Sequence, residues 1–273
     1  MIKPSFNRSL QKAWTHRDSL LCIGLDPDVT RLPAHLRESD TGVLDFCKAI
    51  VDRTHDLVCA YKPQIAYFAD DAREDQLRAV IAYIKATYPH IPVILDAKRG
   101  DIGSTAERYA REAFDRYQAD AVTINPYMGH DSAKPFLERA EKGVIVLCRT
   151  SNPGGAEFQD LLVDGQPLFE RVAVNIAEHW NENNNCGLVL GATWPEQMAR
   201  VRSLVGDLPF LVPGIGAQGG DVEAVLNAGL TERKNGLIIN SARGIIFAGD
   251  DENFASTARD AAHTLRDTIN RYR

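Results

Sequence analysis

The sequence predicts an α/β fold in which residues 1–273 form one domain, a (β/α)8 TIM barrel with an N-terminal capping helix. Short apolar segments alternate with stretches of helical periodicity along the whole chain, which is the pattern of β/α units on a parallel sheet. Eight such units fit into 273 residues, a usual length for a closed barrel that forms a single domain. Polar residues also follow the predicted strands, at the end where barrels of this kind carry their sites.

The predicted strands are short runs of apolar and β-branched residues bounded by glycine, proline or polar residues. In chain order they cover residues 20–26, 61–68, 92–98, 121–125, 143–149, 187–191, 210–214 and 236–241. Amphipathic segments lie between them, the clearest at residues 76–86, 105–117, 169–183 and 195–205, and residues 254–273 close the chain with another. Before the first strand, Phe6, Leu10 and Trp14 recur at helical spacing, which predicts a helix that plugs the N-terminal end of the barrel.

Composition restricts the partners and the compartment. With 31 basic and 37 acidic residues, the net charge of −6 leaves no basic excess with which to bind nucleic acid or an anionic membrane surface. The cysteines contain no C-x-x-C pair, which argues against a disulfide framework or a zinc ribbon; they are Cys22, Cys47, Cys59, Cys148 and Cys186. The first residues contain no apolar h-region, and no apolar run approaches the roughly 18 residues of a membrane span. We therefore expect a cytoplasmic protein.

Charged residues cluster at the end of the third predicted strand, where Asp96, Lys98 and Asp101 lie within six positions. Alternation along a strand puts Asp96 and Lys98 on the same face, toward the barrel axis. Lys62 on the neighbouring strand would extend the cluster to an alternating row of charges. A structural network of salt bridges is one interpretation. A functional site is the better one, because a structural pair does not require so many charges at a strand end.

The charges of this cluster favour one kind of chemistry. An ammonium group between carboxylates stays protonated, so Lys98 suits proton donation to carbon better than attack as a neutral amine. A carboxylate held beside an anionic substrate group repels that group, and the repulsion is relieved if the group leaves as CO₂. The cluster therefore predicts decarboxylation followed by protonation of the resulting carbanion.

The loop after the seventh predicted strand reads PGIGAQGGD over residues 213–221 and contains a formal G-x-G-x-x-G. A dinucleotide site would need an acidic residue at the end of the next strand, but Asn240 and Ser241 stand there. Simple turn glycines are a further alternative. We favour a phosphate cradle, since the loops after strands seven and eight of a barrel commonly bind phosphate, with Gln218 and Arg243 as side-chain ligands.

Taken together, these segments resemble orotidine 5′-phosphate decarboxylase, in particular the longer bacterial type 2 branch of that family, over almost the whole chain. The D-x-K-x-x-D signature is matched by Asp96, Lys98 and Asp101, and the phosphate loop by residues 213–221. The GLDPD segment supplies Asp26, and RTSNPGG at residues 149–155 resembles the segment that reads the pyrimidine. The resemblance implies conversion of orotidine 5′-monophosphate to UMP and CO₂, the last step of de novo UMP biosynthesis, without a metal or an organic cofactor.

The resemblance also implies a role for each matched residue. Lys98 would protonate C6, with Asp96 beside the departing carboxylate. The substrate contacts would be Lys62 and Asp26 at the ribose hydroxyls, Ser151 at the base, and Pro213, Gly216, Gln218 and Arg243 at the phosphate. In that family Asp101 and Thr105 reach into the partner's site, which implies a homodimer with shared active sites. The extra N-terminal helix and the long segment 152–167 depart from the family pattern.

Three rival functions are less favoured. A related sugar-phosphate barrel, such as a 3-keto-gulonate 6-phosphate decarboxylase or a hexulose phosphate synthase, carries a similar D-x-K-x-x-D but uses Mg²⁺ and needs an acidic ligand on the second strand. Here Lys62 puts a cation at that place, which repels a divalent metal. A non-catalytic nucleotide-binding barrel gains nothing from carboxylates aimed at an anion. A metal hydrolase lacks ligands, because the seven histidines show no paired spacing.

Overall fold

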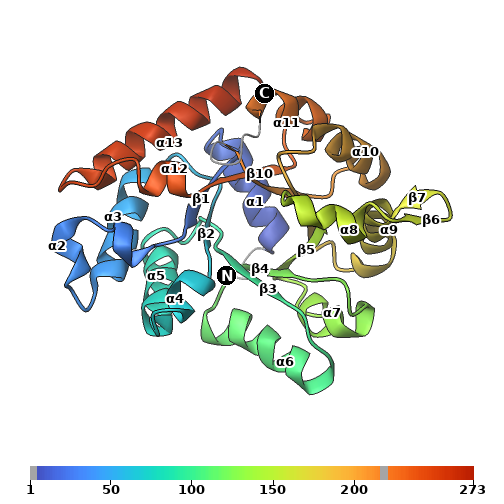
Figure 1. Ribbon diagram of the computed structural model, residues 1–273, viewed down its shortest axis with the longest axis horizontal. Coiled ribbons are helices and arrows are strands. Elements are labelled where there is room, and N and C mark those ends of the chain that lie inside the picture. The colour runs from blue at the N-terminus through green and yellow to red at the C-terminus, as the bar shows by residue number, and fades with distance from the viewer. Residues whose placement is uncertain (1–4, 216–220) are drawn as a thin grey trace.

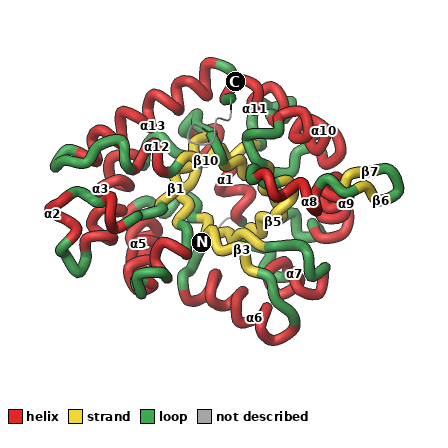
Figure 2. The backbone as a smooth tube through the Cα atoms, in the orientation of Figure 1, coloured by secondary structure: helices red, strands yellow, loops and turns green. Residues whose placement is uncertain are grey.

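The computed structural model describes residues 5–215 and 221–273. Within them, eight parallel strands form the central sheet, and helices surround it as an outer ring (Figures 1 and 2). The strands are β1 Leu21–Leu25, β2 Ala60–Pro63, β3 Ile94–Arg99, β4 Ala121–Ile124, β5 Gly143–Arg149, β8 Cys186–Leu190, β9 Phe210–Pro213 and β10 Leu237–Ser241. Most of the strands are nearly continuous buried apolar runs because helices cover the outer face of a parallel barrel, and β3 departs from this in its charged second half.

The sheet closes on itself. Its order is β2-β1-β10-β9-β8-β5-β4-β3, and the two end strands meet through parallel bridges of Tyr61 with Val93 and of Gln64 with Asp96. Across this seam the amide of Tyr61 donates to the carbonyl of Pro92 at 3.1 Å, and the amide of Ile65 donates to the carbonyl of Asp96 at 3.2 Å. The predicted (β/α)8 fold is confirmed.

The helices and turns between the strands follow the predicted rhythm. They are α1 Phe6–His16, η1 Val29–Arg31, α2 Ala34–Arg37, α3 Gly42–Thr54, α4 Ala66–Ala69, α5 Glu74–Thr87, α6 Gly103–Arg111, η2 Glu112–Arg116, α7 His130–Leu137, η3 Pro153–Gly155, α8 Ala156–Gln159, α9 Leu168–Asn175, η4 Ile176–Trp180, α10 Pro195–Val205, α11 Val222–Gly229, α12 Arg243–Ile246 and α13 Phe254–Arg271. The predicted helix at 195–205 coincides with α10. Those at 105–117 and 169–183 each end in a π-helical turn, η2 and η4.

The second predicted strand is wrong in its second half. β2 ends at Pro63, and residues 66–69 form the short helix α4. The apolar residues Ile65 and Phe68 look like a continued strand in the sequence. In the fold, the amides of Gln64 and Ile65 still bond to the neighbouring strands, and Phe68 then closes the first helical turn with a bond from its amide to the carbonyl of Ile65.

The leading helix α1 closes the N-terminal end of the barrel, as predicted. Phe6, Leu10 and Trp14 are all buried, and in Figure 1 α1 lies in the middle of the barrel. The amide of Phe6 donates to the carbonyl of Glu141, just before β5. The Phe6 ring packs against Gly143, the first residue of β5. A Cβ at position 143 would lie 2.3 Å from this ring, so the position requires glycine.

The long segment after β5 has its own structure. It contains η3, α8 and a small hairpin of β6 Leu162–Val163 and β7 Gln166–Pro167. Asp164 and Gly165 form the two-residue turn with φ of 53° and 79°, the positive values that a tight hairpin with right-handed twist requires. This hairpin projects from the right-hand side of the molecule in Figure 1. Among the helices of the described chain, none is long and apolar enough to cross a lipid bilayer.

Candidate active site

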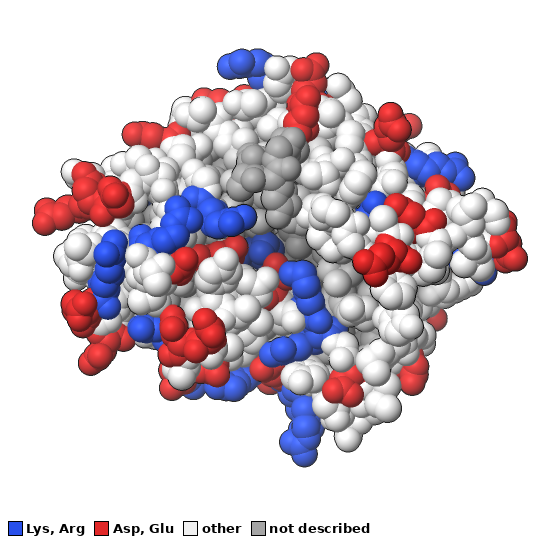
Figure 3. Space-filling view, viewed as in Figure 1, with Lys and Arg blue, Asp and Glu red and all other residues white. Residues whose placement is uncertain are grey.

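The carboxyl ends of the strands surround a cavity of about 270 Å³ at the mouth of the barrel. The predicted site residues that line it are Asp26, Lys62, Asp96, Pro213 and Arg243. Lys62 and Asp96 lie on β2 and β3, and Pro213 is the last residue of β9. Asp26 and Arg243 follow β1 and β10, so the closed sheet brings together residues more than two hundred positions apart in the chain. Figure 3 looks at this face, and basic and acidic side chains meet around the hollow at its centre.

Three of the four predicted charges form a continuous row. Lys62 Nζ donates to Asp96 Oδ2 at 2.7 Å, and Lys98 Nζ donates to Asp96 Oδ1, also at 2.7 Å. The Lys62 side chain is 4% exposed, whereas that of Lys98 is 47% exposed. Asp96 is therefore held between a buried ammonium group and one that is about half exposed to solvent. Asp96 and Lys62 line the cavity, whereas Lys98 lies next to Asp96 but is not itself among the lining residues.

The electrostatics of the row fix its charge state. Burial raises the pKa of Asp96, but Lys62 and Lys98 lower it by more, so it lies well below its ordinary value. Burial lowers the pKa of Lys62, but Asp96 and Asp26 raise it by more, so it lies above its ordinary value. At neutral pH the pair is thus an ammonium and a carboxylate. Burial also raises the pKa of Asp26, and Lys62 only partly offsets this.

A bulge in β3, rather than simple strand alternation, brings Lys98 to Asp96. Leu95 pairs with Val122 and Arg99 with Ile124, so four steps along β3 oppose two along β4. Lys98 has a φ of 47° within this bulge, a left-handed conformation that is uncommon for a lysine. Such strain of about 1–3 kcal/mol persists where the surrounding structure holds it, often at functional sites. The expected juxtaposition is present, but its geometry is not that of a regular strand.

Asp101 does not join the row within one chain. Its Oδ1 accepts a hydrogen bond from the amide of Ile102 at 2.8 Å, and its carbonyl accepts one from the hydroxyl of Ser132. Among the ion pairs of the described residues, none includes Asp101. Thr105 lies exposed in the first turn of α6. Neither side chain lines the cavity of its own barrel.

Ser151 lies just beyond β5, outside the lining of the cavity. The loop that carries it packs against the loop that joins β8 to α10: a Cβ on Gly191 would lie 2.7 Å from the Ser151 backbone, and Trp194 Nε1 donates to the carbonyl of Thr150 at 3.0 Å. At the phosphate end, Pro213 and Arg243 face the cavity. Gly216 and Gln218 lie outside the described residues.

Some lining residues were not predicted from the sequence. Asn240 at the end of β10 is 7% exposed, and its Oδ1 is buried without a hydrogen-bond partner among the described residues. A buried amide oxygen that lines a cavity and has no hydrogen-bond partner can accept a hydrogen bond from a ligand. In the sequence, the position of Asn240 at a strand end was the signal that could have identified it. Gln64 and Tyr67 also line the cavity, because the chain turns into α4 there instead of continuing as a strand.

The sequence and the fold both match known proteins over almost the whole chain. Residues 19–258 match the model of the orotidine 5′-phosphate decarboxylase / HUMPS family. The chain belongs to this family. It is 61% identical over 268 residues to the orotidine 5′-phosphate decarboxylase of Azoarcus sp. (strain BH72), covering 98% of this chain and 99% of that one. It is 60% identical to the enzyme of the same name from Cellvibrio japonicus, covering 97% and 98%. The solved structure of Leishmania donovani OMP decarboxylase matches with a TM-score of 0.86 and 41% identity, covering 98% of both chains.

The relatives compared above carry the decarboxylase name. At the second strand of this member, Lys62 occupies the place where the Mg²⁺-dependent rival would need an acidic ligand. Among the residues that the structure describes, no group of three or more His, Cys, Asp or Glu side chains is arranged to hold a metal ion.

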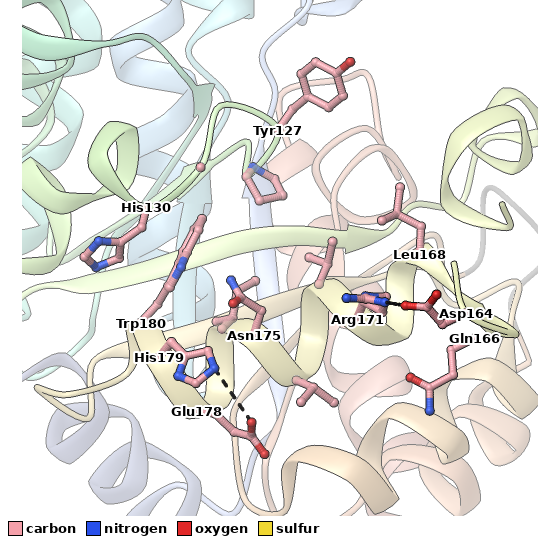
Figure 4. A pocket seen from close by; sticks show the side chains of 15 residues that line it. Tyr127, His130, Asp164, Gln166, Leu168, Arg171, Asn175, Glu178, His179 and Trp180 are labelled. Atoms are coloured by element: carbon pink, nitrogen blue, oxygen red, sulfur yellow. Dashed lines mark hydrogen bonds and ion pairs between the residues drawn. The ribbon is translucent and has the colours of Figure 1, made fainter. Parts of the chain in front are cut away.

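A larger hollow of about 1020 Å³ lies outside the barrel of this family member, between the loop after β4 and the helix α9 with η4 (Figure 4). Its charged groups pair with each other: Arg171 contacts Asp164 at 2.6 Å, and His179 lies 4.0 Å from Glu178. Among the described residues that line this hollow there is no buried, linked row of charges like that of Lys62, Asp96 and Lys98 at the barrel mouth. The smaller cavity is therefore the candidate active site.

Proposed function

We propose that the cavity at the barrel mouth decarboxylates orotidine 5′-monophosphate to UMP and CO₂, with Lys98 as the proton donor to C6. The observation that carries this proposal is the row of Lys62, Asp96 and Lys98, joined by contacts of 2.7 Å. Arg243, the proposed phosphate ligand, lines the same cavity. A chain that is 61% identical to an orotidine 5′-phosphate decarboxylase supports the same substrate.

The row supplies both halves of the reaction. Asp96 is held ionised by two lysines, so a substrate carboxylate beside it meets a fixed negative charge that neutral CO₂ does not meet. The bond between C6 and the carboxylate carbon breaks, CO₂ leaves, and the electron pair stays on C6. Lys98 Nζ then delivers a proton to C6 and becomes a neutral amine. Because its side chain is 47% exposed, it regains a proton from water.

Binding of the remaining substrate is divided among the strand ends. Asp26 and Lys62 would hold the ribose hydroxyls, and Ser151 would hydrogen-bond the base. The phosphate would lie against Pro213, Gly216, Gln218 and Arg243, where backbone N–H groups and a guanidinium group suit a dianion. The proposed reaction needs no metal or organic cofactor.

A second copy of the chain would complete each site with Asp101 and Thr105. Two observations support this homodimer. Asp101 lies outside the cavity of its own barrel, and large apolar side chains face solvent at Ile102, the next residue, and at Tyr127 and Met128 in the loop after β4, which are 56%, 86% and 45% exposed. Exposed apolar patches next to a functional loop are typical of protein interfaces. The chain would act as one domain in the cytoplasm, which the five free, buried cysteines favour.

The direct test is the loss of orotidine 5′-monophosphate absorbance in the presence of EDTA. We expect wild-type protein to consume the substrate and to release one CO₂ for each UMP formed. Activity that depends strictly on added Mg²⁺ would favour assignment to the related sugar-phosphate enzymes and would contradict the proposal. As a control for the assay, the same protein is offered orotate, which lacks the ribose 5-phosphate that the cavity is proposed to bind.

A further inference from the structure

Thr123 lies in the middle of β4 beside the bulge of β3, and it is 1% exposed. Its Oγ1 has three partners: Asp96 Oδ1 at 2.9 Å, the amide of Ala97 at 3.0 Å and the amide of Lys98 at 2.9 Å. One buried hydroxyl therefore contacts both the carboxylate of the row and the backbone of its proton donor.

The direction of each hydrogen bond follows from the partners. A hydroxyl has one proton to donate and two lone pairs with which to accept. The two amides can only donate, so they occupy both lone pairs of Oγ1. The hydroxyl proton is then free to point in one direction only, toward the carboxylate of Asp96. All three bonding positions are used, and turning the hydroxyl proton toward either amide would leave that N–H without its acceptor.

These bonds replace those that the bulge removes. Between Leu95 and Arg99 the regular pairing of β3 with β4 is interrupted, so Ala97 and Lys98 have no paired residue on β4. Oγ1 of Thr123 accepts from both and so holds the left-handed backbone of Lys98. Its donated bond adds to those from Lys62 and Lys98 and fixes the orientation of the Asp96 carboxylate.

We propose that Thr123 is a positioning residue for the reaction, setting through one hydroxyl both the place of Lys98 and the orientation of the Asp96 carboxylate. This inference rests on the proposed roles of those two residues. Thr123 lies outside the lining of the cavity, so it acts on the reacting groups and not on the bound nucleotide. Its loss should therefore lower kcat and leave nucleotide affinity nearly unchanged.

The test compares Thr123→Val with Thr123→Ser. Valine has almost the same shape as threonine but lacks the hydroxyl, whereas serine keeps the hydroxyl and lacks the methyl group. We expect Thr123→Val to lose about tenfold to a hundredfold in kcat, the loss that one hydrogen bond to a charged group would cause. UMP affinity, measured by calorimetry, should change by less than about threefold. Thr123→Ser should recover kcat to within about threefold of wild type.

Thr54→Val is the matched control, because Thr54 is also a fully buried threonine with a double hydrogen bond, to the carbonyl of Ile50 and to the hydroxyl of Tyr61, but lies in α3 away from the cavity. It should lower the melting temperature without lowering kcat. If Thr123→Val does not fold by circular dichroism, Thr123→Ala takes its place with the same expected loss.

A kcat of Thr123→Val equal to that of wild type would overturn the inference. Equal losses in the valine and serine variants would also overturn it, because they would assign the effect to the methyl group. A loss confined to UMP affinity would also overturn it. The proposed function is judged separately by Lys98→Ala. If that variant turns over at the wild-type rate, the assigned chemistry is wrong whatever Thr123 does.

Discussion

Lys98 is the residue whose loss should cost the most activity, since it is the side chain placed to protonate C6. We expect Lys98→Ala to have no measurable turnover, because Lys62, the other ammonium group of the row, is buried against Asp96 and is assigned to the ribose hydroxyls instead of C6. UMP binding should remain detectable by calorimetry, since the proposed phosphate and base contacts come from other strands. Lys12→Ala, on the exposed face of α1, serves as a control with wild-type turnover. A Lys98→Ala enzyme with more than about a tenth of wild-type turnover would contradict the assignment.

Arg243 should act through the phosphate alone. In Arg243→Ala, loss of a charge-assisted contact worth about 1.5–3 kcal/mol should lower kcat/KM for orotidine 5′-monophosphate at least about tenfold. Orotidine, which lacks the phosphate, should be turned over equally by wild type and variant in the same absorbance assay. A large further loss on orotidine would show that Arg243 acts somewhere else in the site.

At the scale of elements, a buried arginine holds the segment that carries Ser151. The side chain of Arg149, at the end of β5, is 1% exposed. Its nitrogens donate to Gln197 on α10 at 2.8 Å, and to Gln159 at the end of α8 and Asp160 just after it at 3.1 Å each. The guanidinium carbon lies 4.4 Å from the ring centre of Trp194. One planar, multidentate cation thus joins the end of β5 to two other segments, which a lysine cannot reproduce.

We predict that Arg149→Lys loosens this segment. Hydrogen exchange of the amides in residues 150–160 should become faster, and the free energy of unfolding should fall by about 1–3 kcal/mol. Arg171→Lys is the matched control, because Arg171 makes an exposed pair with Asp164 on the hairpin. Unchanged exchange in residues 150–160 of Arg149→Lys would show that the loop is held by its backbone contacts alone.

The C-terminal helix α13 is attached to the end of α3 by a pair whose strength depends on pH. Arg259 donates to both oxygens of Asp56 at 2.6 and 2.8 Å, and these bonds lower the pKa of Asp56 from 3.8 to about 2. Because the folded pKa lies below the unfolded one, the stabilisation is complete above pH 3.8 and is lost as the pH falls toward 2. Both side chains are more than a third exposed, at 37% and 46%, so we expect only about 0.5–1 kcal/mol.

Urea unfolding of Asp56→Asn at a series of pH values tests this. The variant should be less stable than wild type at pH 6, and the difference should shrink as the pH is lowered to 3. Asp75→Asn provides the comparison, because its pair with Arg78 is 60% and 87% exposed and should contribute nothing measurable at either pH. A difference that stays constant with pH would exclude the titration of Asp56 as its cause.

At the scale of the whole molecule, the shared site predicts complementation between subunits. A dimer with two-fold symmetry has two equivalent sites, so a subunit with only Lys98→Ala can be mixed with one that has only Asp101→Ala. If Asp101 serves the partner's site, one site of the mixed dimer carries both changes and the other carries neither. After dissociation and reassociation, the mixture should regain up to about a quarter of wild-type activity, from one intact site in half of the dimers. Background activity after confirmed subunit exchange would leave Asp101 serving its own chain.

Sequence and structure agree where the signal is local. The amphipathic pattern predicted α10 with its observed ends, because burial of one helix face imposes a period on nearby residues. The cluster of Asp96 and Lys98 was also visible, because chemistry-bearing residues interrupt an apolar strand. The predicted strand through residue 68 failed because an apolar run serves equally as a strand or as a short helix, and the choice depended on bonds from Gln64 and Ile65 to neighbouring strands.

The sequence by itself determined the barrel, the decarboxylase-like cluster and the family resemblance, since alternation, residue type and spacing are all properties of the linear chain. Only the tertiary structure decided that a bulge turns Lys98 toward Asp96 and that the hydroxyl of Thr123 holds that bulge. The tertiary structure also placed Asn240 in the cavity lining, with a side-chain oxygen that has no hydrogen-bond partner among the described residues. It also placed Asp101 outside the cavity of its own chain. These features depend on hydrogen bonds between strands that are distant in the sequence, and such partners become defined only when the sheet closes.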